Sequence, residues 1–299
     1  MSYAEFVAFR RSLPRTPPLS RQTVRARGID FALFSSPPPP VGRVPPVLCI
    51  NGGMLYDHSM LWPALSPLAE RRQVILYDQR GRGRSTAPQV PGDATIEDDA
   101  ADVGALRRAL GIRQWDVLGH SWGGGIAMLA TAADAGGVRR LALVDPVWTT
   151  SAWTAPLRQA VLARLHGGQR DAVARISEET LGSPDPALHS AYSRAVYPAW
   201  FADEEMAIHF TPPDATSDTG AAVLARLRRD GYDWRDRVRA LSTPTLVLHG
   251  ERDPLPVGLA DSVHGSYLGR AQVVVVPSAG HMPFWEAPRR FFELLASFL

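Results

Sequence analysis

Short, continuously apolar runs alternate with stretches of helical periodicity in the first half of the chain. Three of these runs are Val47–Ile50, Val74–Tyr77 and Leu141–Val144, and each is followed by a loop of small or polar residues. A strand that is apolar on both faces is typical of a parallel sheet with helices packed on both sides. The pattern therefore predicts an α/β fold with a mostly parallel central sheet.

The best-defined predicted helix spans Thr95 to Leu110. Thr95 and Asp98 have the spacing of a capping box, acidic residues fill the first turn, and Gly111 follows the last turn. Residues 62–70 are also predicted to be helical, and the closing helix is expected at residues 289–299. Two short β patterns, at residues 21–27 and 30–34, predict an N-terminal hairpin that turns at Arg27-Gly28.

The alternation stops at Trp148 and resumes with the strand patterns of residues 245–248 and 272–276. Between them the pattern is helical and amphipathic, with several prolines and no β-branched run of strand length. We interpret residues 148–233 as a helical lid inserted over the carboxyl edge of the sheet. The α/β core then consists of residues 1–147 and 234–299.

The chain is organised around the motif Gly119-His120-Ser121-Trp122-Gly123. An apolar strand precedes it, and a run of small residues of helical character follows it. A serine on such a strand-to-helix turn has a strained backbone and an exposed hydroxyl, and the flanking glycines allow the turn to fold back on itself. This context predicts a nucleophilic serine, with His120 facing away from it.

Other strand ends carry residues that suit acyl transfer. Asp253 follows one predicted strand, His281 follows the last, and Gly52-Gly53 follows the first long one. A serine hydroxyl needs a base, imidazole has a suitable pKa, and a carboxylate behind it fixes the tautomer. The chain order Ser, Asp, His is the one expected for an elbow nucleophile. Asp145 also ends a strand and competes with Asp253 for the carboxylate role; its alternative is a strand-end cap.

With these motifs, the sequence resembles the α/β-hydrolase superfamily over about residues 20–299. Tyr77-Asp78-Gln79-Arg80-Gly81-Arg82-Gly83-Arg84-Ser85 and the Ser121 elbow are most similar to the proline iminopeptidase branch. The resemblance implies Ser121 as nucleophile, Asp253 as acid and His281 as base. It also implies an oxyanion hole formed by the backbone N–H groups of Gly53 and Trp122. Where that branch has His-Gly-Gly-Pro-Gly, this chain has Asn-Gly-Gly-Met-Leu at residues 51–55.

Five further residues are predicted as substrate contacts. Met54, Trp148 and Trp285 lie near strand ends and could line an apolar pocket. An aminopeptidase would also need a carboxylate for the ammonium group of its substrate. Glu204 and Glu205 are the candidates for that role.

The loop Gly81-Arg82-Gly83-Arg84-Ser85 follows a strand but lacks the third small residue of a dinucleotide-binding fingerprint. We interpret it as a structural turn whose arginines are solvated or paired.

Composition excludes several other classes. The formal net charge is +2, from 32 basic and 30 acidic residues, with no basic stripe that would predict a nucleic-acid partner. The single cysteine, Cys49, lies in an apolar run and is predicted to be a buried small side chain. No histidines have metal-ligand spacing, no segment is apolar enough to span a membrane, and no secretory leader is evident. We expect a cytoplasmic protein without cofactor or metal, and the oligomeric state stays open.

The sequence thus predicts a serine hydrolase that cleaves a small ester, amide or lactone through an acyl-enzyme. An N-terminal prolyl peptide is the most specific substrate hypothesis. The alternatives are a biosynthetic or detoxifying esterase or lactonase, and a non-catalytic binding module on the same fold. Epoxide hydrolase and dehalogenase chemistry is disfavoured, because those enzymes use a carboxylate nucleophile at the elbow.

Overall fold

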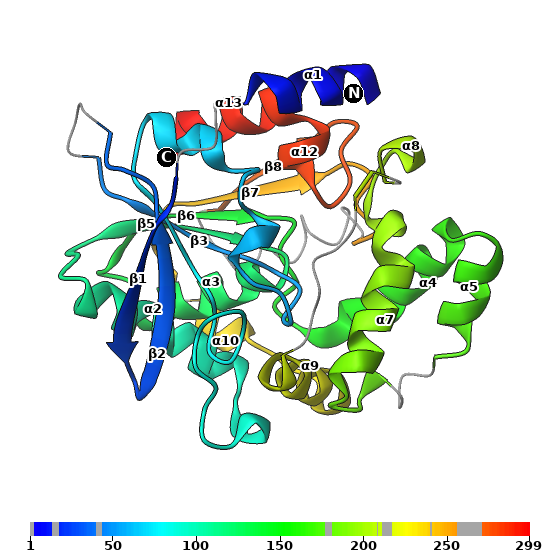
Figure 1. Cartoon of the computed structure of the whole chain (residues 1–299), viewed down its shortest axis with the longest axis horizontal. Helices are drawn as coiled ribbons and strands as arrows, with labels where there is room; N and C mark the ends of the chain where they lie inside the picture. The colour runs from blue at the N-terminus through cyan, green and yellow to red at the C-terminus, as the bar shows by residue number, and fades with distance from the viewer. Residues whose placement is uncertain are drawn as a thin grey trace.

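A computed structural model describes the chain over residues 3–13, 18–39, 44–176, 181–207, 209–210, 217–239, 241–255 and 271–299. Across these residues, eight strands form one sheet in the order β1-β2-β4-β3-β5-β6-β7-β8 (Figure 1). The strands are β1 (Ser20–Ala26), β2 (Ile29–Ser35), β3 (Val47–Ile50), β4 (Val74–Tyr77), β5 (Trp115–His120), β6 (Val138–Val144), β7 (Thr245–Gly250) and β8 (Ala271–Val276).

Six of these strands, β3 to β8, run parallel, whereas β1 pairs with β2 and β2 pairs with β4 antiparallel. The predicted hairpin is confirmed, and its two-residue turn has positive φ at both Arg27 (47°) and Gly28 (79°). Two consecutive residues of positive φ match the twist of the flanking strands. The predicted mostly parallel sheet is therefore correct, with an antiparallel N-terminal edge.

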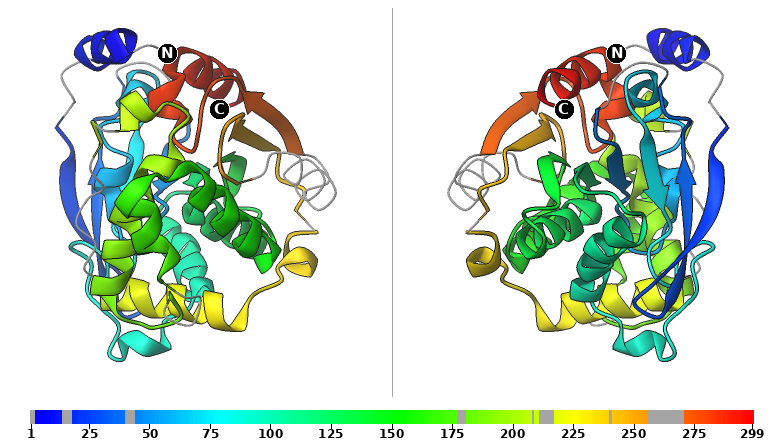
Figure 2. Two further views of the ribbon diagram at one scale, coloured as in Figure 1. Left: turned by 90° about the vertical axis from the view of Figure 1, so that its right-hand side faces the viewer. Right: turned by 90° about the vertical axis from the view of Figure 1, so that its left-hand side faces the viewer.

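The described α-helices cover both faces of the sheet and one of its edges (Figures 1 and 2). They are α1 (Tyr3–Ser12), α2 (Ile96–Ala109), α3 (Trp122–Ala133), α4 (Thr154–Arg164), α5 (Gly167–Ala174), α7 (Pro186–Val196), α8 (Glu204–Ala207), α9 (Asp218–Asp230), α10 (Arg235–Val238), α12 (Pro283–Glu286) and α13 (Pro288–Phe298). None of these helices is long and apolar enough to cross a membrane.

The apolar core lies in two layers because successive strand residues point to opposite faces. Leu48 and Ile50 of β3 pack in the layer that contains residues of α2 and α3, whereas Val47 and Cys49 pack in the layer that contains residues of α1, α12 and α13. Every residue of β3, β4, β5 and β7 is buried. This two-sided burial is what the continuous apolar runs predict.

The helix predicted at residues 95–110 is confirmed as α2, with a complete capping box between Thr95 and Asp98. The prediction for residues 62–70 is wrong in type, because only a 3₁₀ helix forms there, at Ser66–Glu70. Pro63 and Pro67 lack the backbone N–H that an α-helical ladder requires, which explains the difference.

The two ends of the inserted segment are hydrogen-bonded to each other. Ser151 N donates to Tyr232 O at 3.0 Å and Trp234 N donates to Thr149 O at 2.7 Å, beside a β-bridge between Thr150 and Asp233. Between these paired ends of the segment, helices α4, α5 and α7 lie beyond the carboxyl ends of the parallel strands (Figure 1; Figure 2, left). We propose that residues 148–233 form a cap inserted into the α/β core.

Two arginines of the 80–85 loop, Arg80 and Arg82, are buried ion-pair partners of α2. Arg82 and Asp99 have fully buried side chains and form two N–H···O contacts of 2.9 and 3.0 Å. Arg80 pairs with Asp102 through contacts of 2.6 and 2.7 Å. Arg82 Nε also donates to the carbonyl of Met54 at 2.8 Å. These contacts join two loops and a helix, and they bury the side chains of Asp99 and Asp102.

We predict that Arg82→Met destabilises the fold by about 3–5 kcal/mol, because it leaves the Asp99 charge buried without its partner. The free energy of unfolding, measured with urea, tests this. The double variant Arg82→Met with Asp99→Leu removes the orphaned charge and should recover part of the loss. A cost below 1 kcal/mol for the single variant would contradict a buried charge pair.

Candidate active site

Ser121 lies on a sharp turn between β5 and α3. Its backbone has φ 55° and ψ −123°, a conformation that L-residues rarely adopt. A Cβ on Gly119 would stand 2.3 Å from the carbonyl oxygen of Gly123, and a Cβ on Gly123 would stand 2.2 Å from that of Ile50. The two glycines flanking the turn are therefore required by close backbone packing, as the sequence predicts.

His281 and Asp253 meet beside this turn. His281 Nδ1 lies 2.7 Å from Asp253 Oδ2, and both side chains are buried. The second oxygen of Asp253 accepts a hydrogen bond from Leu255 N at 2.9 Å. Burial opposes the charge on Asp253, but the nearby His281 imidazole lowers its pKa to about 2. Asp253, rather than Asp145, is thus the carboxylate in contact with His281.

Gly53 and Trp122 supply the backbone amides predicted to face a developing oxyanion. Trp122 is the first residue of α3, so its N–H has no carbonyl partner within the helix. Gly53 has a positive φ of 77°. The preceding residue, Gly52, packs closely on the serine turn, because a Cβ at Gly52 would stand 2.6 Å from the Cβ of Ser121. The loop after β3 therefore lies directly against the serine.

Polar contacts from the loop after β4 hold this glycine loop in place. Gln79 Nε2 donates to Asn51 O at 2.9 Å, and Asn51 Nδ2 donates to Tyr56 O at 3.1 Å. Together with the Arg82 bond to Met54 O, these contacts surround Gly52 and Gly53 with buried donors. They fix the loop without the proline of the iminopeptidase pattern.

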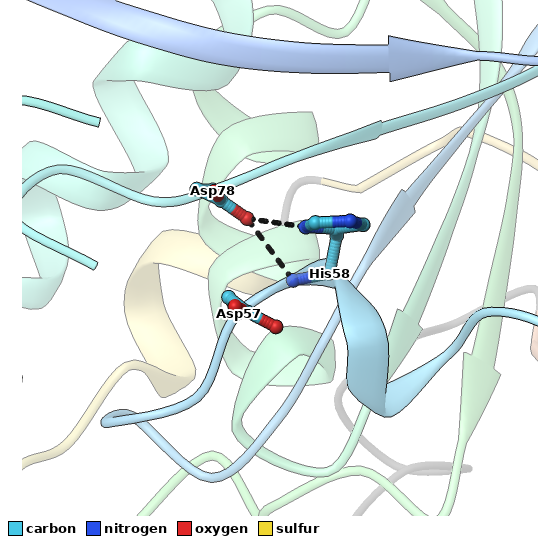
Figure 3. Close-up of side chains that lie close together, drawn as sticks. All are labelled: Asp57, His58 and Asp78. Carbon is cyan, nitrogen blue, oxygen red and sulfur yellow. Dashed lines mark hydrogen bonds and ion pairs between the residues drawn. The ribbon is translucent and has the colours of Figure 1, made fainter. Parts of the chain in front are cut away.

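Figure 3 shows a third contact between the same loops. Asp78 accepts hydrogen bonds from His58 N at 3.1 Å and from His58 Nδ1 at 2.7 Å through one oxygen. Its other oxygen accepts from Arg84 N at 2.8 Å. Asp57, which completes a cluster of potential metal donors, accepts from Ser59 N and caps a short helix. Hydrogen bonds within the protein explain why these three residues lie together. We therefore interpret the cluster as a structural link between the two loops.

A cavity of about 820 Å³, including its opening, lies above Ser121 and His281. The cap supplies much of its wall, from one face of α7 at i, i+3, i+4 and i+7 spacing and from one face of α9. The residues on those faces are His189, Tyr192, Ser193 and Val196 of α7, and Leu224 and Arg228 of α9. Trp153, Leu157 and Trp200 add apolar surface. The site is a mostly apolar chamber beneath the cap.

The five predicted substrate contacts lie away from this wall. Met54 and Trp148 are buried in the core, and Trp285 packs against Phe6 at a ring distance of 6.0 Å. Glu204 and Glu205 are on α8, where Glu204 is 75% exposed and lies 3.4 Å from His166. Among the described residues, no carboxylate lines the cavity. The sequence pattern places aromatic and acidic residues near strand ends, but their directions depend on packing that it does not show.

The expectation that His120 faces away from the site is wrong. Its Nε2 lies 2.8 Å from the carbonyl oxygen of His281, and the two rings are 4.9 Å apart. Because a carbonyl only accepts hydrogen bonds, Nε2 carries the proton. Burial, and secondarily the neighbouring His281, lowers the pKa of His120 to about 3. His120 is therefore a neutral support for the backbone of His281.

Glu286 is a residue of the site that the sequence did not single out. Its Oε2 accepts from Gly280 N at 2.9 Å and Met282 N at 3.2 Å, on either side of His281. Its Oε1 accepts from Ala202 N in the cap at 2.6 Å. The His281 loop is thus fastened both to α12 and to the cap. One acidic residue within the apolar Pro283–Pro288 stretch was the available signal.

Comparisons with known proteins agree with this architecture. Residues 45–288 match the family model described as alpha/beta hydrolase fold, and the chain belongs to that family. It is 29% identical over 279 residues to a proline iminopeptidase of Lactobacillus delbrueckii subsp. lactis, covering 85% of this chain and 90% of that protein. It is 30% identical over 233 residues to a 2-hydroxymuconate semialdehyde hydrolase of Pseudomonas putida, covering 77% and 78%.

A solved relative shares the fold at lower identity. The crystal structure of the enol-lactonase from Burkholderia xenovorans LB400 superposes with a TM-score of 0.67 at 22% identity, covering 93% of this chain and 99% of that one. The two relatives found by sequence support a hydrolase, and their names give different substrates, so neither assigns the substrate of this chain.

We predict that Gly52→Ala lowers kcat on the order of a hundredfold. Its Cβ would stand 2.6 Å from Ser121 Cβ and 3.2 Å from Oγ, so the serine must shift. Gly92→Ala is the matched control, because a Cβ there meets nothing within 4 Å. Turnover of an aryl ester by both variants tests the prediction, and equal activities would contradict the packing of this loop on the serine.

Burial raises the pKa of Glu286 from 4.5 to about 7, although three amides donate to it. Between these values the folded chain keeps a proton that the unfolded chain releases. The contribution of Glu286 to stability is therefore complete below pH 4.5 and is lost as the pH rises through 7. We expect the unfolding free energy of wild type minus Glu286→Gln to fall by up to about 3 kcal/mol over that interval.

Urea unfolding at a series of pH values measures this difference. Glu293→Gln, at a side chain that is 62% exposed, is the control and should give a flat difference. A flat or rising difference for Glu286→Gln would show that the buried carboxyl group is ionised throughout.

Proposed function

We propose that the chain is a serine hydrolase that cleaves small esters or lactones through an acyl-enzyme on Ser121. The observation that carries the proposal is the 2.7 Å bond between His281 Nδ1 and Asp253, at the cavity that Ser121 also lines. The strained turn at Ser121 and the amides of Gly53 and Trp122 support it.

In the proposed reaction, Ser121 Oγ attacks the carbonyl carbon of the substrate while His281 Nε2 takes the hydroxyl proton. The carbonyl oxygen becomes an oxyanion, which the N–H groups of Gly53 and Trp122 stabilise; each such donor contributes about 3 kcal/mol in comparable sites. Collapse expels the alcohol, which takes the proton from His281. Water then attacks the acyl carbon while His281 takes a proton from it. The second intermediate breaks its bond to Ser121 Oγ, which takes that proton back from His281 as the acid leaves.

The Ser121 hydroxyl and the His281 ring line the same cavity, and no hydrogen bond joins the two among those of the described residues. Catalytic hydrogen bonds of this kind are often long before substrate binds. Asp253 is already in contact with Nδ1, so the tautomer that leaves Nε2 free to act as base is fixed in advance.

The cavity wall favours a neutral or anionic substrate. Arg228 contributes a cation, and the described wall holds no carboxylate for an ammonium group. His189 Nε2 lies 2.7 Å from the carbonyl of Ser183 and so carries the proton, which leaves Nδ1 as an acceptor. An apolar acyl group, with or without a terminal carboxylate, suits this surface better than a free amine.

An N-terminal prolyl aminopeptidase is the second candidate, favoured by the identity to proline iminopeptidase over 85% of the chain. It requires a carboxylate near the substrate amine. Glu204 and Glu205 do not meet this need from their exposed positions on α8.

Parallel assays of p-nitrophenyl butyrate, prolyl p-nitroanilide and N-acetylprolyl p-nitroanilide, with Ser121→Ala as the blank, separate the two candidates. We expect turnover of the ester and none of the anilides above the blank. Arg228→Met should raise KM about tenfold for an aryl ester whose acyl chain ends in a carboxylate, and leave KM for the neutral ester unchanged. Selective turnover of the free-amine anilide would overturn the proposal in favour of the aminopeptidase.

A further inference from the structure

A second buried carboxyl group, that of Asp145, lies directly behind Asp253. Asp145 follows β6, has a positive φ of 42° and is fully buried. Its N–H donates to Leu248 O at 2.9 Å, and its Oδ1 accepts from Gly250 N at 2.7 Å. Both partners belong to β7, which leads into the turn that carries Asp253. The Asp145 side chain is therefore fixed against that turn.

A carboxyl oxygen of Asp145 lies within 4.8 Å of one of Asp253, and neither side chain has any exposed surface. Two buried carboxyl groups this close repel each other when both are ionised, so one of them keeps its proton. Asp253 already accepts from His281 Nδ1 and from Leu255 N, and both contacts favour its charged form. Asp145 Oδ2, in contrast, meets no donor among the described residues. The proton therefore belongs on Asp145.

The titratable groups that face Asp145 are Asp253, His249 and Glu286. His249 Nε2 lies 3.1 Å from Leu255 O and so carries the proton, while its Nδ1 stands 3.8 Å from Asp145 Oδ1. Burial lowers the pKa of His249, so this imidazole stays neutral. Burial, followed by the charge of Asp253, raises the pKa of Asp145 well above its ordinary value. Among the described residues, no cation faces Asp145 directly.

We propose that Asp145 is a positioning residue that keeps its proton at neutral pH and donates a hydrogen bond to the Asp253 carboxylate. This inference rests on the proposed function, in which Asp253 orients His281. A neutral donor holds the Asp253 carboxylate in place and lowers its basicity. It does so without adding a second negative charge beside Asp253. Asp145 thus acts through Asp253 and does not touch the reacting atoms.

Asp145→Asn and Asp145→Gly test the proposal, because both residues tolerate the positive φ at this position. The amide of asparagine can donate the bond that the protonated acid donates, whereas glycine removes it. Hydrolysis of p-nitrophenyl butyrate is measured from pH 5 to 9 with Ser121→Ala as the blank. The acid limb of the kcat/KM profile reports protonation of the catalytic imidazole.

We expect Asp145→Asn to keep kcat within about threefold of wild type, with an unchanged acid limb. Asp145→Gly should lower kcat about tenfold with little change in KM. Its acid limb should move to higher pH, since Asp253 without its donor is more basic and stabilises the imidazolium further. If Asp145→Gly does not fold, judged by circular dichroism, the comparison of Asp145→Asn with wild type carries the test.

An acid limb that moves to lower pH in Asp145→Asn would show that Asp145 is ionised, and would overturn the proposal. Equal losses of kcat in both variants with unchanged profiles would show a packing role only, and would also overturn it. A readout independent of activity is ¹³C NMR of labelled aspartate, in which the carboxyl resonance lost in Asp145→Asn should have the shift of a protonated acid at pH 7. Absence of esterase activity in wild type with this protonated resonance present would count against the proposed function alone.

Discussion

The strained turn at Ser121 is the constraint on which the rest of the site depends. A positive φ at a residue with a side chain costs free energy, and the surrounding structure must hold it in place. In this protein, close backbone contacts hold Ser121 in this conformation, and they leave no room for a Cβ at Gly119 or Gly123. The turn directs the serine side chain out of the sheet and presents the first amides of α3 beside it. Loops from other strands can then meet the hydroxyl at one edge.

Buried charge and hydrogen bonding hold those loops in register. Arg82 links α2 to the loop of Gly52 and Gly53 through Asp99 and the carbonyl of Met54. Glu286 links the His281 loop to the cap through Ala202. Each group would be costly to bury alone, and each is satisfied by several partners. These two buried groups therefore lie where the site must be rigid, while the substrate chamber itself is mostly apolar.

Much of the fold could be predicted because it depends on local patterns. Continuous apolar runs gave the buried parallel strands, and the Thr95–Asp98 spacing gave the start of α2. The chain order of Ser121, Asp253 and His281 could be read from strand ends, and the structure brings Asp253 and His281 into contact. The side-chain directions of His120, Trp148 and Trp285 could not be read in this way, because tertiary packing decides them. Asp99, Asp102 and Glu286 were missed because a buried carboxylate is recognisable only once its donors, distant in sequence, are in place.

We propose that Ser121 is a nucleophile activated by His281. The most direct measurement is the reaction of the whole chain with a fluorophosphonate, followed by peptide mass mapping, for wild type, Ser121→Ala and His281→Gln. We expect one adduct, on Ser121, that forms at least about a hundredfold more slowly in His281→Gln and is absent in Ser121→Ala. A wild-type chain that remains unlabelled, or is labelled equally fast without His281, would contradict it and favour a fold that binds small molecules without catalysis.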